Sequence, residues 1–147
     1  MHDVNITRIH SVWTVFALSM AAFGVAGIAN ATPGTARSVL AATLAIAGVY
    51  GTARVARGLS RPMLARLSLG LWLAFITIAV VHLPGIETVA VAAPTPDTAT
   101  IAGLTGLTWA TLVGACSTTS FLAIEEATMG AESTAIEDSV VEQEYDF

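Results

Sequence analysis

Residues 98–124 constrain the fold of this chain more than any other stretch, because they contain no Asp, Glu, Lys, Arg or His. A helix that crosses a membrane needs about 20 predominantly apolar residues, since the hydrocarbon core is about 30 Å thick. Residues 98–124 exceed that length without interruption. The stretch therefore predicts a transmembrane helix around which the rest of the chain is arranged.

Three earlier stretches are also long and predominantly apolar, at residues 11–29, 36–53 and 64–83, and the ionisable residues in the last two, Arg37, Arg66 and His82, lie near their ends. The whole chain is 54% hydrophobic and 12% charged, whereas soluble domains are about 25% charged. We therefore predict an all-α polytopic protein of the cell membrane. Residues 1–124 form a four-transmembrane-helix bundle surrounded by lipid, and residues 125–147 form a short, acidic, disordered tail.

The first span has a competing interpretation as a signal peptide. Arg8 precedes the apolar run, and Ala29-Asn30-Ala31 resembles the small-residue cleavage site of such a peptide. The run is longer than the usual apolar core of about 7 to 15 residues, and a second span follows directly. We favour an uncleaved helix, with cleavage after Ala31 as the alternative.

Small side chains recur at every fourth position of the last span, at Ala102, Gly106, Ala110 and Gly114. In lipid, helices associate by close packing of such residues, and pairs of this kind cross at about −40°. A four-residue step on a helix advances about 400°, so this stripe drifts by about 40° per step and suits a crossing partner. We predict that Gly106 and Gly114 lie against the first span, the second span or a second copy of the chain.

Four of the six Arg residues lie in the loop after the second span, at Arg54, Arg57, Arg61 and Arg66. One interpretation is a binding site for anionic lipid head groups or for a phosphorylated ligand. The simpler one is the excess of positive charge that marks the cytoplasmic side. Arg8 falls on the same side and only Arg37 on the other, so both termini are predicted to be cytoplasmic.

The chain end carries acids and no cation. Glu125 and Glu126 end the last span on the side of the arginine loop, and at least one Arg–Glu ion pair is expected there. Glu87 and Arg37 are the corresponding candidates on the other side. Residues 127–147 suit either a disordered solvating tail, which we favour, or a segment that folds on a basic partner.

Chemistry-bearing motifs are missing from the sequence. Ionisable groups inside a membrane usually mark transport or proton relay, and no predicted span has one near its middle. We find no metal-ligand spacing, no phosphate-binding loop and no cofactor motif, so we expect neither an enzyme nor a nucleic-acid partner. The single cysteine, Cys116, is interpreted as a packing residue.

Two functions fit this pattern. The first is a structural or accessory subunit that packs against another membrane protein or against itself. The second is a passive channel or small transporter subunit that acts as an oligomer, with Thr and Ser hydroxyls lining a shared face. The first is favoured, because the small-residue stripe suits helix packing.

The composition of the chain and the layout of its predicted spans resemble those of one known class of protein. The chain has no Lys, its cations are all Arg and its net charge is −5; high salt screens the repulsion among such excess carboxylates. In these respects the whole chain resembles small four-helix integral membrane proteins of unknown function from haloarchaea. The resemblance implies a halophilic source and the four-span layout, and no functional residues.

Overall fold

The computed structural model describes the backbone of residues 3–144 and the side chains of residues 11–130. All regular structure within this range is helical, in five helices. Four of them are long and apolar enough to cross a membrane. The helices are α1 (Asp3–Asn30), α2 (Thr35–Ala56), α3 (Arg61–Val81), α4 (Ile86–Ala92) and α5 (Asp97–Glu144).

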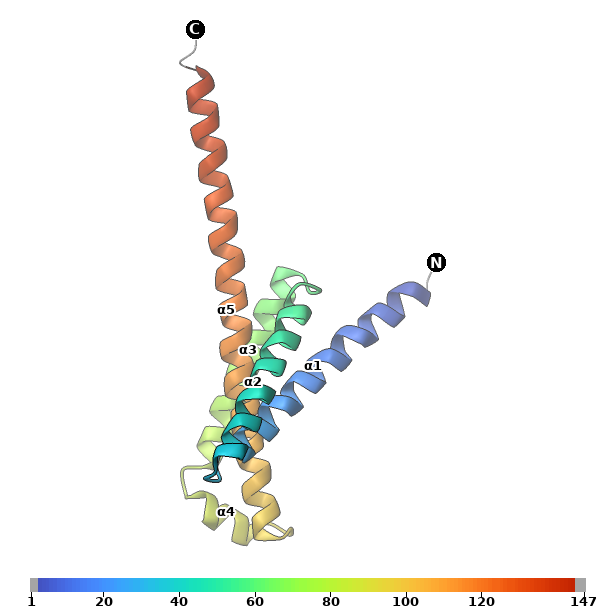
Figure 1. Cartoon of the computed structure of the whole chain (residues 1–147), viewed down its shortest axis with the longest axis vertical. Coiled ribbons are helices and arrows are strands. Elements are labelled where there is room, and N and C mark those ends of the chain that lie inside the picture. The colour runs from blue at the N-terminus through green and yellow to red at the C-terminus, as the bar shows by residue number, and fades with distance from the viewer. Residues whose placement is uncertain (1–2, 145–147) are drawn as a thin grey trace.

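The helices form an open bundle around α5 (Figure 1). The chain descends along α1, returns along α2, descends along α3 and returns along α5, with the short α4 at the lower end. α5 contacts every other helix, α1 and α2 pack extensively on each other, and α3 packs mainly on α5. The α2–α3 turn, the start of α1 and the end of α5 therefore lie toward one end of the bundle, and the α1–α2 turn and α4 toward the other.

Glycine permits the two sharpest turns. Gly34 precedes α2 with φ +146° and Gly85 precedes α4 with φ +95°, conformations that L side chains rarely adopt. α2 consequently begins at Thr35. α3 has Ser60 as its N-cap residue and a proline in its first turn, where the missing backbone N–H costs no hydrogen bond.

The last helix differs from the sequence prediction. Disorder was predicted from residue 125, whereas α5 continues as helix to Glu144; residues 145–147 lie outside the described range. The segment contains many good helix formers such as Ala and Glu, and an established helix extends without a new nucleation cost. At about 1.5 Å per residue, the 48 residues of α5 span about 72 Å, and its C-terminal part extends beyond the bundle (Figure 1).

Apolar side chains cover the outside of the four long helices. Leu18, Ile46, Leu69 and Leu107 are each more than half exposed. The interior is small, and the largest fully buried side chains are Phe23, Leu64, Val55, Thr52 and Thr118. An apolar exterior around a thin interior is unsuited to water.

Candidate functional site

No group of three or more metal-binding side chains occurs in the part of the chain whose side chains are described. In that part, every buried side-chain nitrogen and oxygen also has a hydrogen-bond partner. The candidate site is therefore a packing site: the junction of α1, α2 and α5, with the cavity beside it.

The backbones of α1 and α5 touch at Gly24 and Gly106. A Cβ atom added to Gly24 would lie 3.2 Å from the carbonyl oxygen of Gly106 and 3.7 Å from its Cα. A Cβ added to Gly106 would lie 3.1 Å from Cδ1 of Ile28 and 3.5 Å from the carbonyl oxygen of Gly24. A Cβ at either position would therefore be tighter than most such contacts and would require a shift of a few tenths of an ångström, and a larger side chain would require the helices to move apart.

Large side chains cover glycines on either side of this crossing. The Trp109 ring of α5 lies against Gly27 of α1, where an added Cβ would clash with Cγ of the ring. Met20 of α1 lies against Gly114 of α5, with Cε 2.5 Å from the added Cβ. On the other side of α1, the Phe23 ring covers Gly48 of α2 in the same way, with Cε1 at 2.5 Å. Three helices are thus joined by side chains seated on glycines.

The predicted stripe on α5 lies mostly in this junction. Gly106, Ala110 and Gly114 are buried, and Ala102 is half-buried near the start of the helix. Their neighbours in the structure come from α1 at Gly106, and from α1 and α3 at Gly114. Between them, Leu107 remains 54% exposed on the outer side.

The contact between α5 and α3 is of another kind. Thr119 of α5 is hydrogen-bonded to Ser68 of α3 through their hydroxyl oxygens at 2.7 Å. It also accepts a hydrogen bond from the indole Nε1 of Trp72 at 3.1 Å. The Thr119 hydroxyl donates to the carbonyl of Ala115 in its own helix at 2.8 Å, so one hydroxyl connects two helices.

The arginine loop lies at the end of the bundle where α2 meets α3. The expected ion pair is present: Nη2 of Arg61 lies 2.8 Å from Oε1 of Glu126. Arg54, Arg57 and Arg66 are exposed, and among the described side chains none of them pairs with a carboxylate. Arg37 and Glu87, the pair expected at the other end of the bundle, do not form an ion pair with each other in the described part of the chain.

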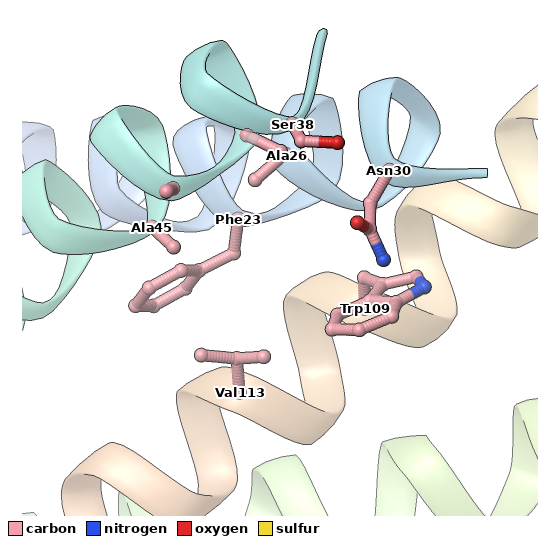
Figure 2. A pocket seen from close by; sticks show the side chains of 9 residues that line it. Phe23, Ala26, Asn30, Ser38, Ala45, Trp109 and Val113 are labelled. Atoms are coloured by element: carbon pink, nitrogen blue, oxygen red, sulfur yellow. The ribbon is translucent and has the colours of Figure 1, made fainter. Parts of the chain in front are cut away.

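A cavity of about 280 Å³ opens between α1, α2 and α5, beside the glycine crossing. Phe23 and Val113 face its inner part, and Asn30 and Trp109 face its other end (Figure 2). Its lining is Phe23, Ala26, Asn30, Ser38, Ala41, Ala42, Ala45, Trp109 and Val113. Only Asn30, Ser38 and the indole nitrogen offer side-chain polar atoms.

No protein-family model, curated protein or solved structure matches the chain.

Several residues of the junction are not indicated by the sequence. Gly24 and Gly27 are three residues apart, so they escape a search for small residues at every fourth position. Phe23 and Trp109 look like ordinary lipid-facing aromatics. The Thr119 bonds link residues 51 and 47 positions apart in the chain, and no local pattern indicates such a pairing.

Proposed function

We propose that the chain is an integral membrane protein that crosses the bilayer four times, with both termini in the cytoplasm, and acts as a structural or accessory subunit. In this role it packs against another membrane protein or against a second copy of itself. We also propose that the chain is not an enzyme and that it comes from a halophilic source.

The register between α3 and α5 supports the membrane placement. The Arg61–Glu126 ion pair joins the two helices at one end, and the Ser68–Thr119 hydrogen bond joins them further in. The 21 residues of α3 extend about 31 Å at 1.5 Å per residue, which matches a hydrocarbon core of about 30 Å. The ion pair then lies at the interface, and the rest of α5 beyond it lies in the cytoplasm.

Packing of the first helix supports an uncleaved α1. α1 makes the most extensive contact in the bundle, with α2, and supplies Phe23, which is fully buried. Cleavage after Ala31 would remove this helix and leave Gly48, Gly106 and Gly114 without the side chains and backbone that cover them. A mature chain of that kind would have an incomplete interior.

The hydroxyls at membrane depth weigh against the alternative of a passive pore. Thr43 donates to the carbonyl of Val39 at 2.9 Å, Thr77 to that of Leu73 at 2.8 Å, and Thr111 to that of Leu107 at 2.8 Å. Such bonds satisfy the hydroxyl hydrogen within its own helix. These side chains therefore require no water or ion beside them.

The free surface of α3 is the observation that carries the accessory role. Only Leu64 and Ser68 are buried on this helix, although it is long enough to span a membrane. Leu73 is 56% exposed, and a Cβ added to Gly70 would meet nothing within 4 Å. A span attached along one side only presents an apolar surface on which a further helix can pack.

Site-specific photo-crosslinking tests this role. A photoreactive amino acid at Leu73, on the free side of α3, is compared with one at Val39, which is 61% exposed on α2. We expect a discrete protein adduct from position 73 in native membranes and lipid adducts alone from position 39. Lipid adducts alone from both positions would contradict the accessory role, and an adduct of twice the chain mass would identify the partner as a second copy.

Cysteine accessibility tests the orientation. Val91 of α4 is 77% exposed, whereas its neighbour Ala90 is buried and unsuitable as a probe. In a Cys116→Ala background, an impermeant maleimide applied to intact cells should label Val91→Cys and should not label Gly58→Cys or Met129→Cys. Labelling at Gly58 and Met129 without labelling at Val91 would invert the proposed topology.

A further inference from the structure

We propose that the cavity between α1, α2 and α5 binds one hydrocarbon chain of a membrane lipid, with the polar end of that lipid beside Asn30 and Ser38. The inference rests on the membrane placement in the proposed function, and it adds a defined lipid-binding site to it.

The size and lining of the cavity favour a hydrocarbon over water. Its volume of about 280 Å³ lies just below the range of about 300–1,000 Å³ for pockets that take drug-sized ligands. Buried water needs about two to four polar partners. The inner part is formed by apolar side chains, including Phe23, Ala45 and Val113, so water there would lack hydrogen bonds.

The polar groups lie at the end of the cavity where a lipid head group would be. Asn30 is the last residue of α1 and Ser38 lies in the first turn of α2, so both are at the ends of spans. Phe23 and Ala45 are each seven residues further along the same helices, a depth of about 10 Å toward the bilayer centre. A lipid chain that enters from the interface would follow this gradient from polar to apolar.

Both polar side chains have hydrogen-bonding capacity for an ester or glycerol group. Ser38 donates its hydroxyl hydrogen to the carbonyl of Gly34 at 3.2 Å, which leaves oxygen lone pairs to accept. The exposed Asn30 amide carries two donor hydrogens and an acceptor oxygen. Trp109 has its indole ring beside Asn30 (Figure 2), in the position that amphipathic aromatic rings favour at a membrane interface.

Quenching of Trp109 fluorescence by brominated phospholipid tests the proposal. The chain has three tryptophans, so Trp13→Phe with Trp72→Phe leaves Trp109 alone, and Trp72→Phe with Trp109→Phe leaves the lipid-facing Trp13 as a reference. Each protein is reconstituted in phosphatidylcholine vesicles with a rising fraction of chain-brominated phosphatidylcholine. We expect Trp109 quenching to saturate at a lower fraction of brominated lipid than Trp13 quenching, as for a bound rather than a surrounding lipid.

A substitution that fills the cavity tests whether the early saturation of Trp109 quenching comes from a lipid bound there. Ala45→Phe places a ring in the cavity, whereas Ala47→Phe adds the same ring on α2 outside the lining. We expect Ala45→Phe to abolish the early saturation at Trp109 and Ala47→Phe to retain it. Ala42→Phe, at an exposed lining position, serves the same purpose if Ala45→Phe does not fold, as judged by circular dichroism.

Each remaining outcome overturns the proposal in a distinct way. Iodide quenching of Trp109 that Ala45→Phe abolishes would show that water fills the cavity, because quenching at the exposed edge of the ring does not depend on Ala45. If the Trp109 emission changes with the protein-to-lipid ratio but not with the brominated fraction, a second copy fills the cavity. Unchanged saturation in Ala45→Phe would place the lipid elsewhere.

Co-flotation of the protein with the vesicles under high-salt and urea washes reports insertion into the bilayer separately. Failure there contradicts the membrane placement, whereas inserted protein without early saturation contradicts the lipid site alone.

Discussion

α5 is joined to α1 and to α3 by two different kinds of contact. At α1 the backbones themselves meet, and at Gly24 and Gly106 even a small side chain would need a shift of a few tenths of an ångström, whereas a large one would push the helices apart. At α3 the helices are connected by the hydrogen bonds of Thr119 with Ser68 and Trp72, and α3 buries only two residues. The first junction depends on shape, and the second depends on a few polar atoms.

The difference indicates which part of the bundle is rigid. A steric contact between backbones has no way to relax except by moving a whole helix, and overpacking typically costs about 1–3 kcal/mol. Interhelical hydrogen bonds in membranes average about 0.6 kcal/mol, because a partly separated helix finds other partners. We expect α1, α2 and α5 to form the stable unit, and α3 to be the helix that separates first.

The largest expected effect is that of Gly106→Leu. The new side chain would collide with Ile28 and with the backbone of Gly24, so we expect a loss of about 1–3 kcal/mol in unfolding free energy, measured by SDS-induced unfolding in detergent. Gly103→Leu is the matched control, because a Cβ at Gly103 meets nothing within 4 Å. Equal stability of the two variants would show that α1 does not touch α5 at this point.

An intermediate effect is expected from Thr119→Val at the other junction. The substitution keeps the shape and removes the oxygen that Ser68 and Trp72 share, so we expect a loss of about 0.6–1.7 kcal/mol, from the average to the maximum measured for interhelical bonds in a membrane protein. Thr111→Val is the control, since that hydroxyl donates to carbonyls of its own helix. A loss from Thr119→Val larger than that from Gly106→Leu would reverse the order of the two junctions.

The smallest effect is expected from Glu126→Gln, which removes the ion pair with Arg61. The two side chains are 40% and 64% exposed, and pairs of this kind contribute about 0–1 kcal/mol. The change in thermal unfolding temperature should therefore be small, and should decrease as salt is raised. A large decrease in unfolding temperature that persists in high salt would mean that the ion pair is buried, which contradicts the exposure of both side chains in this structure.

Much of the helical layout can be predicted from the sequence, because the long apolar stretches and the Pro and Gly residues between them set the long helices. The position of α5 as a helix in close contact with its neighbours follows from the four-residue spacing of its small residues. The end of α5 could not be predicted in the same way, because acidic composition alone favours solvation in either a helix or a disordered chain. The helix continues to Glu144 through Gly130, and no proline interrupts residues 125–144.

The candidate site is less visible in the sequence. Small residues indicate that helices approach closely, and they do not indicate which helices. That choice depends on shapes that come together in three dimensions, such as the Trp109 ring against Gly27 and the Phe23 ring against Gly48. The cavity results from the same shapes, since three helices that cross at glycines diverge beyond the crossing.

Disulfide trapping tests the central claim, the backbone contact between α1 and α5, most directly. A Cβ at Gly24 would lie 3.7 Å from the Cα of Gly106, and disulfides usually join residues whose Cα atoms are about 4.4–6.8 Å apart. In a Cys116→Ala background, Gly24→Cys with Gly106→Cys is oxidised in the membrane and its free thiols are counted by maleimide mass-tagging in SDS. The crossing described here predicts that both thiols are lost, whereas Gly24→Cys with Gly103→Cys keeps both. Two free thiols in the 24/106 pair after oxidation would contradict it.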